Sequence, residues 1–332
     1  MSASGGNTMP RLLACLAAGF SCLALIVGAA AQSAYPNRPV QLIISYGAGS
    51  TGDVSMRLLM EQLSAKLGQP FVVINKPGAG GIAAAQAAAA TPPDGYTLFL
   101  TGNSSAISVA LFKSLPYNIL TDFAPVSTVA NFDMVVVVKA GVPLKSMQDV
   151  ITYAKANPGK LNVGTLAPGT TEFLAAELFK IATGTDIAAV PFRTSPDMMT
   201  AVLRGDVDVG FEFFAPMQAL LADHRLTAIA TTGKTRADFL PDVPTVIEGG
   251  IANFDVTSWN GITVPAGTPR PIVDTLSQTT IEALKTPSVQ EAGKRLGMEM
   301  RGGTPEQLTA RLKSDIAKWT DVVEKAHIPK MD

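Results

Sequence analysis

The sequence predicts an α/β protein built from two lobes, with additional helices at its C-terminal end. Short apolar runs of strand length alternate with segments whose apolar residues recur at helical spacing, and this pattern occurs twice along the chain. From Pro269 onward the signals are almost wholly helical. The 332 residues, 47% hydrophobic and 16% charged, are enough to form two hydrophobic cores of ordinary size.

The first half of this pattern predicts a βαβαβ unit with a parallel sheet. A glycine-rich turn follows the first strand, and Gly68 stands where the C-cap of the next helix is expected. In such units the loops gather at the carboxyl ends of the strands. The predicted strands are 40–44, 71–74 and 96–100, and the predicted helices are 53–67 and an alanine-rich segment that ends at Ala90.

The second half repeats this order of elements. Ser146 and Asp149 are spaced as an N-terminal capping box, and Pro196 stands at the first position of a later helix. Thr304 and Gln307 have capping-box spacing before the final helix. Apolar segments of this half are 161–164, 188–190 and 207–211.

The two halves predict a division of the chain into lobes. We expect the chain to cross between them near 131–135 and 253–257. The predicted parts are an export segment at 1–34, lobe 1 at 35–133 plus 254–332 with the C-terminal helices, and lobe 2 at 134–253.

The N-terminal segment has the pattern of an export signal. Arg11 precedes an apolar stretch at 12–27, and small alanines follow this stretch. The pattern predicts a signal peptide that is cleaved between Ala31 and Tyr35, and therefore a periplasmic protein. An uncleaved membrane anchor is one alternative, because the apolar segment is nearly long enough to span a bilayer. A lipoprotein attached at Cys15 is another.

Composition excludes several classes of function. Lys and Arg number 26 against 27 Asp and Glu, for a net charge of −1 without a basic run, so we expect no nucleic-acid partner. The histidines, His224 and His327, stand in charged surroundings and provide little material for a catalytic triad or a metal site. Cys15 and Cys22 both lie in the export segment, so the mature chain would have no disulfide and no thiolate ligand. We therefore expect no cofactor and no metal ion.

A glycine-rich loop follows the first predicted strand. Gly47, Gly49 and Gly52 match the dinucleotide-binding fingerprint between a strand and a helix. That fingerprint requires an acidic residue at the end of the second strand, whereas Asn75 and Lys76 stand there. A simpler interpretation is that these glycines let backbone N–H groups at a helix start approach an anion.

Four predicted helices begin with small hydroxyl or glycine residues, two in each half. Serine and threonine are also ordinary N-caps, so a single loop of this kind does not define a site. Because the four helix starts follow equivalent strand ends, together they favour an anion site between the halves. Glu212 follows an apolar strand and could contact a ligand, while Asp53 could do so or simply favour the first turn of its helix. The four helix starts are 50–52, 104–105, 169–171 and 194–195.

Eight short motifs follow one another along the chain after the apolar export stretch. They are 35–40, 49–53, 75–81, 93–98, 154–162, 174–179, 240–245 and 265–269. In this order they resemble the Bug family, the TctC-like periplasmic receptors of tripartite tricarboxylate transporters. The resemblance covers the whole mature chain and implies a two-lobed periplasmic-binding-protein fold of type II, the Venus-flytrap fold, whose lobes close over a ligand.

The resemblance also implies a set of ligand contacts made by backbone amides, hydroxyls and ordered waters. In the first lobe these are Tyr46, Ser50, Thr51, Gly52 and Asp53, with Ser104 and Ser105 nearby. In the second lobe they are Thr170, Thr171, Phe192, Ser195 and Glu212. Phe173 and Glu212 stand where many family members carry His and Asp, at positions that would contact the variable part of a ligand.

The sequence as a whole therefore predicts an extracytoplasmic solute-binding protein and not an enzyme. We expect a monomer that captures a small carboxylate in the cleft and delivers it to the membrane subunits of a tripartite tricarboxylate-type transporter. One alternative is a sensor subunit that presents the carboxylate to a membrane signalling protein. An exported hydrolase is the other alternative, although no nucleophile with a base in reach is visible.

Overall fold

The computed structural model describes residue 2 and residues 35–332, and Arg38–Asp332 form one unit. The predicted export segment at 1–34 lies outside the described residues, apart from residue 2. Across the described residues, no helix is both long enough and apolar enough to cross a membrane.

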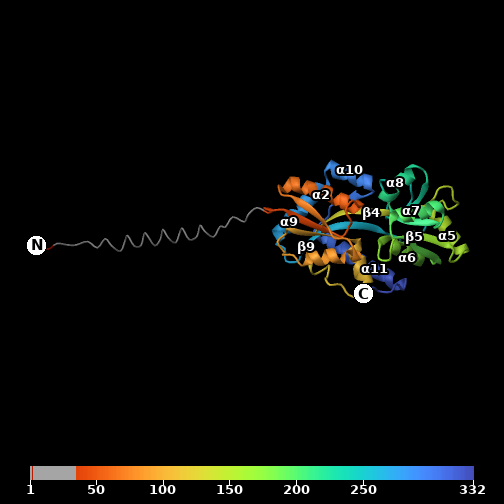
Figure 1. Ribbon diagram of the computed structural model, residues 1–332, viewed down its shortest axis with the longest axis horizontal. Coiled ribbons are helices and arrows are strands. Elements are labelled where there is room, and N and C mark those ends of the chain that lie inside the picture. Colours follow the sequence, from red (N-terminus) through yellow and green to blue (C-terminus); the bar gives the residue numbers. More distant parts are fainter. Residues whose placement is uncertain (1, 3–34) are drawn as a thin grey trace. The chain divides into compact units, whose positions relative to one another are not determined.

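The first half of the chain folds as the predicted βαβαβ unit (Figure 1). Its elements are β1 (Val40–Ile44), α2 (Thr51–Leu67), β2 (Phe71–Asn75), the 3₁₀ turn η1 (Ala79–Gly81), α3 (Ile82–Ala89), β3 (Thr97–Gly102) and α4 (Asn103–Leu111). β1 pairs in parallel with both β2 and β3. Ser50 caps the start of α2, and Gly68 ends it in the left-handed conformation that the sequence predicted.

The second half contains a similar parallel unit. Its elements are α5 (Met147–Ala156), β5 (Leu161–Thr165), α6 (Thr171–Thr183), β6 (Ile187–Pro191), α7 (Ser195–Arg204), β7 (Val209–Phe213), α8 (Phe214–Ala222) and β8 (Leu226–Thr231). β5 pairs in parallel with β6 and β7. Thr170 and Thr194 cap α6 and α7 by accepting from backbone N–H groups three residues later. The sequence analysis identified neither α8 nor β8.

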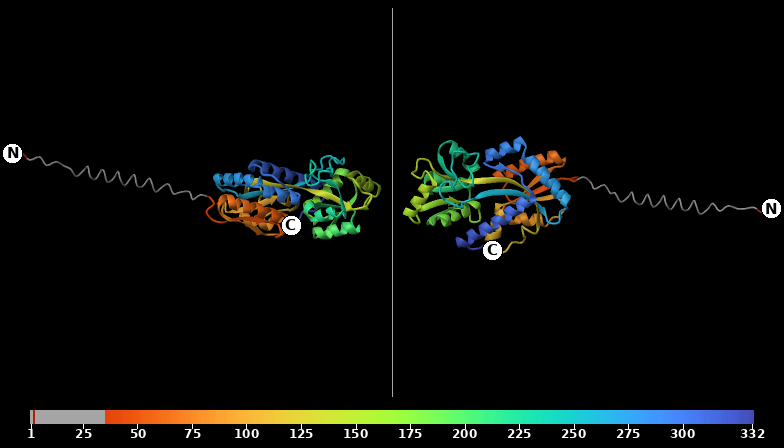
Figure 2. Two further views of the ribbon diagram at one scale, coloured as in Figure 1. Left: turned by 90° about the horizontal axis from the view of Figure 1, so that it is seen from above. Right: turned by 180° about the vertical axis from the view of Figure 1, so that it is seen from behind.

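Two strands that the sequence analysis also missed, β4 (Phe123–Lys139) and β9 (Thr257–Pro265), connect the halves. β9 is antiparallel to both β3 and β4, and β4 is antiparallel to β7 and β8. The strand order β2-β1-β3-β9-β4-β7-β5-β6 therefore makes one mixed sheet, although the sequence indicated only parallel pairing. β4 runs from one half into the other (Figures 1 and 2).

The pairing partner of β4 changes along its length. This strand pairs with β9 up to Asp133 and with β7 from Met134 onward. Below, lobe 1 names residues 38–133 with 254–332, which is the predicted lobe 1 without residues 35–37, and lobe 2 names residues 134–253 as predicted. As a domain division, this assignment stays a prediction.

The C-terminal part packs mainly on lobe 1 (Figure 2). Its elements are α9 (Arg270–Leu284), α10 (Pro287–Leu296), β10 (Glu299–Met300) and α11 (Pro305–Lys325). This part is not wholly helical, because β10 pairs with β4. α11 packs against α4 and β4 and also reaches α6 of lobe 2. Trp259 and Trp319 are fully buried in the core.

Candidate functional site

A cavity of about 780 Å³ lies between the two lobes. Lobe 1 contributes the turn after β1, the starts of α2 and α4, and part of β9. Lobe 2 contributes the starts of α6 and α7 and the end of β7. The volume is in the range of sites that enclose a small molecule.

Most of the residues that the sequence predicted as ligand contacts lie around this cavity. Those that line it are Tyr46, Ser50, Gly52, Ser104, Thr170, Thr171, Ser195 and Glu212. Thr51 begins α2, but its side chain lies outside the described part of the structure. The remaining predicted contacts, Asp53, Ser105 and Phe192, are not lining residues. The structure thus brings residues from four helix starts to one cavity, and their contact with a ligand stays a prediction.

Asp53 organises the loop before α2 and does not line the cavity. Its carboxylate accepts hydrogen bonds from three donors, the Gly49 N–H at 2.8 Å, Arg57 Nε at 3.0 Å and Asn75 Nδ2 at 2.8 Å. The Arg57 hydrogen bond contributes most to lowering the pKa of Asp53 to about 2. A carboxylate with these partners holds the loop in shape, which explains an acidic residue at this position without a ligand.

Ser105 and Phe192, like Asp53, do not line the cavity and contact other parts of the protein. Ser105 is buried within α4, whereas Ser104 lines the cavity, because successive helix residues point about 100° apart. Phe192 packs against the hydrophobic core of lobe 2. Nearby predicted contacts, Ser104 and Ser195, line the cavity instead.

Asn260 lines the cavity from β9, and the sequence analysis missed it. The residue is 0% exposed, and its Oδ1 accepts a hydrogen bond from the Tyr46 hydroxyl at 2.9 Å. Its Nδ2 has no hydrogen-bond partner among the described residues. Burial raises the pKa of Tyr46 to about 12, despite the opposing effect of Asn260, so the phenol stays protonated as a donor. Asn260 stands among Thr257, Ser258 and Thr263, so no local signal in the sequence set it apart.

Tyr46 occupies space that only a glycine at position 52 leaves free. A Cβ atom added to Gly52 would collide with the ring of Tyr46. The glycine-rich loop therefore serves close packing of this ring beside the helix start, in addition to any approach to an anion.

Glu172 and Glu212 place two buried carboxyl groups in the lobe 2 wall of the cavity, 4% and 1% exposed. Burial, together with repulsion from Glu212, raises the pKa of Glu172 to about 8. Burial also raises the pKa of Glu212, although the nearby Ser195 hydroxyl and the Phe213 N–H oppose this rise. The Phe213 N–H donates to Oε1 at 2.7 Å.

The second oxygen of the Glu212 carboxyl, Oε2, has no hydrogen-bond partner in the described chain. The Ser195 hydroxyl lies near this carboxyl but does not form a hydrogen bond with good geometry to Oε2. Sequence analysis missed the neighbouring Glu172, because an acidic residue in the first turn of a helix is ordinary.

Asn103 joins the two lobes beside the cavity. Its Nδ2 donates to Thr171 Oγ1 across the lobes at 2.9 Å. Its Oδ1 accepts from Trp319 Nε1 of α11 at 2.7 Å. Because Asn103 and Thr171 begin α4 and α6, this contact holds two helix starts of opposite lobes close together.

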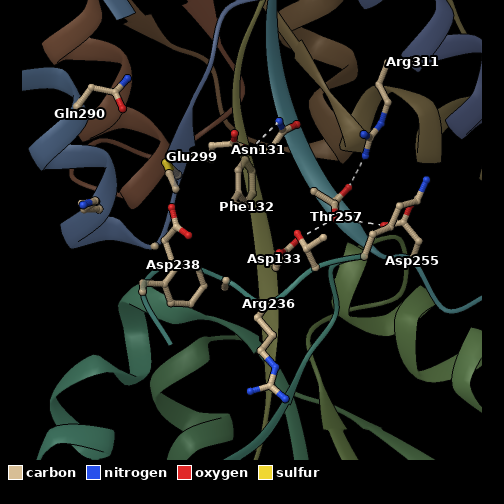
Figure 3. A pocket seen from close by; sticks show the side chains of 17 residues that line it. Asn131, Phe132, Asp133, Arg236, Asp238, Asp255, Thr257, Gln290, Glu299 and Arg311 are labelled. Carbon is tan, nitrogen blue, oxygen red and sulfur yellow. Dashed lines mark hydrogen bonds and ion pairs between the residues drawn. The ribbon is translucent and has the colours of Figure 1, made fainter. Parts of the chain in front are cut away.

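A second pocket, of about 350 Å³, lies where β4 and β9 approach α10 and the segment after β8 (Figure 3). Figure 3 shows Asp133 beside Thr257, whose hydroxyl donates to Asp133 Oδ1 at 2.6 Å. Arg311 donates to the backbone oxygen of Thr257 at 2.7 Å. This pocket contains acidic and basic side chains, and Phe132 lines both it and the larger cavity.

The substitution Asp133→Asn should stabilise the protein at neutral pH. Burial raises the pKa of Asp133 to about 6, and nearby Asp255 and Glu299 add to the rise, while Thr257 and Arg311 lower it. Since the folded pKa exceeds the unfolded one, the native state binds the proton more tightly, and stability falls as pH rises from about 4 to 6. Asparagine keeps the acceptor for Thr257 without the charge.

We expect Asp133→Asn to increase the free energy of unfolding by about 2 kcal/mol at pH 7.5, with no gain near pH 4. Urea unfolding at both pH values measures this difference. The exposed Asp238 lines the same pocket, so Asp238→Asn is a control with the same change in charge. An equal gain at both pH values would contradict the assignment to Asp133 ionisation.

The larger cavity has a chemical character unlike that of the second pocket. Among the described residues that line it, none is Lys, Arg or His. An anion bound there would be held by backbone N–H groups, hydroxyls and Asn260. In the described part of the chain, no group of three or more His, Cys, Asp or Glu side chains is placed to hold a metal ion.

Two lobes around a cavity lined by helix starts define the chain as a two-lobed solute-binding protein. The family model described as tripartite tricarboxylate transporter family receptor matches residues 55–328, and the chain belongs to this family. This confirms the resemblance found in the sequence. The members of this family are periplasmic receptors and not enzymes.

Relatives of known sequence and structure agree with this assignment. Protein BugT of Bordetella pertussis is 33% identical over 319 residues, which cover 96% of this chain and 98% of BugT. The structure of Rpa4515 from R. palustris with adipate is 32% identical, has a TM-score of 0.79, and covers 90% of this chain and 100% of its own. MatC from Rhodopseudomonas palustris with bound malate is 29% identical, with a TM-score of 0.73 and coverage of 87% and 100%.

Proposed function

We propose that this protein, after export and removal of residues 1–34, captures a small carboxylate in the cavity between its lobes. It then delivers the carboxylate to the membrane subunits of a tripartite tricarboxylate-type transporter. The family description supports this partnership, and the adipate and malate held by two related structures support a carboxylate ligand.

The observation that carries the proposal is the fully buried amide nitrogen of Asn260 in the cavity wall, which has no hydrogen-bond partner in the described part of the chain. A buried donor without an acceptor is costly, and a ligand carboxylate oxygen would satisfy it. The starts of α2 and α4 contribute backbone N–H groups and a favourable helix dipole. These neutral donors can bind a carboxylate by charge-assisted hydrogen bonds without a cationic side chain.

The proposed contacts follow from the residues that line the cavity. In lobe 1 the carboxylate would contact Asn260, Tyr46, Ser50, Gly52 and Ser104, and Thr51 stays a proposed contact. In lobe 2 the ligand would contact Thr170, Thr171, Ser195 and Glu212. Asp53, Ser105 and Phe192 are proposed to support these residues and not to touch the ligand.

Binding would favour the closed arrangement of the lobes. A ligand that contacts both walls binds more tightly when the lobes are close, so it shifts the population toward that state. The hydrogen bond between Asn103 and Thr171 would form in the same closed state, because it joins the lobes directly.

Thermal unfolding of the ligand-stripped mature protein tests this function. The panel contains mono-, di- and tricarboxylates, amino acids and aromatic acids, with matched neutral alcohols and amides as controls. A ligand at a hundredfold excess over its Kd stabilises the native state by about 2.7 kcal/mol, so a micromolar ligand gives a clear shift. We expect stabilisation by one chemical subset of carboxylates. If no carboxylate stabilises the protein, and mass spectrometry verifies that bound ligand had been removed, the proposal is wrong.

A further inference from the structure

The two lobes touch at one edge of the cavity, where the end of α10 meets the start of α8 (Figure 1). Gly297 is the C-cap of α10 in lobe 1, and Phe214 is the first residue of α8 in lobe 2. Their neighbours line the cavity, Leu296 and Met298 from lobe 1 and Phe213 from lobe 2. The contact therefore lies at the rim of the cavity, and it depends on how far the lobes have closed.

Position 297 has no space for a residue larger than glycine. A Cβ atom added there would lie 2.6 Å from Cβ and 2.9 Å from Cδ1 of Phe214, whereas carbon atoms in contact are normally about 3.5–4.0 Å apart. Phe214 is held in place, because it is 8% exposed, packs in the hydrophobic core of lobe 2, and has its ring centroid 4.6 Å from that of Phe239. The two lobes can approach this closely only because Gly297 has no side chain.

The end of helix α10 explains this glycine only in part. The φ of Gly297 is 70°, and the Met298 N–H donates to the Gly293 carbonyl oxygen at 2.8 Å, as in a Schellman motif. Gly68 ends α2 in the same left-handed conformation, with a φ of 69°, but a Cβ atom added to Gly68 would meet open space. The two glycines share one backbone requirement, and Gly297 has in addition a steric requirement that the opposite lobe sets.

We propose that Gly297 is a positioning residue for lobe closure, because its missing side chain lets α10 lie directly against Phe214 when the lobes close over a ligand. The inference rests on the closure that the proposed function requires, and it does not depend on which carboxylate is bound. A methyl group added at Gly297 would hold the lobes apart by about 1 Å at this rim. Since apparent affinity scales with the population of the binding-competent closed state, the same methyl group would weaken binding.

The substitutions Gly297→Ala and Gly68→Ala form a matched pair. Each places alanine at a left-handed helix end of lobe 1, so both should lower the free energy of unfolding by a similar amount in urea denaturation. Only Gly297→Ala adds a clash between the lobes, and we expect it to lower the ratio of closed to open protein at least about fivefold. Asparagine tolerates the left-handed conformation, so Gly297→Asn with Gly68→Asn gives the same comparison if alanine prevents folding.

Pulsed electron paramagnetic resonance measures the separation of the lobes in the ligand-stripped mature protein. The chain from residue 35 onward contains no cysteine, so spin labels can be attached at Lys285→Cys in lobe 1 and Asp223→Cys in lobe 2, two exposed positions beside α10 and α8. In Gly297→Ala the component with the shorter label separation should fall at least about fivefold relative to the longer one. Gly68→Ala should keep the wild-type distribution. The same distribution in Gly297→Ala as in Gly68→Ala overturns the inference.

Calorimetric titration with the carboxylate that most stabilises the wild-type protein is the second readout. Gly297→Ala should bind this compound at least about fivefold more weakly, and Gly68→Ala should bind it as the wild-type protein does. Equal affinities of the two variants overturn the inference and leave carboxylate capture intact. If no carboxylate binds any of the three proteins, the proposed function fails, and the label separations still decide the inference.

Discussion

The substitution Asn260→Asp should abolish carboxylate binding while the protein still folds. Aspartate keeps an oxygen that accepts from the Tyr46 hydroxyl, but it replaces the unpaired amide donor with a negatively charged acceptor. Like charges placed together in a binding site cost several kcal/mol, so we expect affinity to fall more than about 100-fold. Calorimetric titration with the strongest stabilising carboxylate measures the loss.

The exposed Asn118 provides the control for this experiment. Asn118→Asp has the same change in charge in lobe 1, and Asn118 does not line the cavity. Its Oδ1 accepts from the Leu120 N–H, a hydrogen bond that aspartate keeps. Unchanged affinity in Asn260→Asp would remove Asn260 from the site and, with it, the observation that carries the proposed function.

The substitution Asp315→Ala should cause a large loss of stability. Asp315 is 3% exposed, and its carboxylate accepts from Trp259 Nε1 at 2.5 Å and pairs with Arg311 at 3.0 Å and Lys318 at 3.2 Å. Alanine would leave a buried indole N–H unpaired and two cations without their partner. We expect the free energy of unfolding to fall by about 3 kcal/mol, measured by urea denaturation.

The same helix contains a matched control. Asp321 forms an exposed ion pair with Lys325 at 2.8 Å, and such pairs contribute little, so Asp321→Ala should change stability by less than about 0.5 kcal/mol. Equal losses of unfolding free energy in Asp315→Ala and Asp321→Ala would show that the buried contacts of Asp315 contribute no more than an exposed ion pair.

The sequence predicted the parallel units of both lobes because their signals are local. Ser50, Gly68 and the capping threonines specify where helices begin and end, and short apolar runs specify the buried strands. β4 and β9 were missed because their pairing joins residues more than a hundred positions apart, and no local pattern reports such pairing. The mixed sheet follows from these two strands alone.

The candidate site was predictable where it depends on helix starts. Hydroxyl residues at or near four helix starts indicated which loops would meet, and the structure brings residues from all four helix starts to one cavity. Asn260 and Glu172 were not predictable in this way, because each is unremarkable within its own segment. Their importance arises from burial beside Tyr46 and Glu212, which lie far away in the sequence.

The position of β9 in the sheet has a consequence for how the chain folds. Lobe 2 is one continuous stretch, so it can bury its core as soon as that stretch is available. In lobe 1, β9 lies between β3 and β4, and neither strand gains this neighbour until residues 257–265 arrive. Two unpaired strand edges and a slow, long-range closure step therefore precede the completion of lobe 1. Early folding should show a protected lobe 2 beside an aggregation-prone lobe 1 until residues 257–265 have been synthesised.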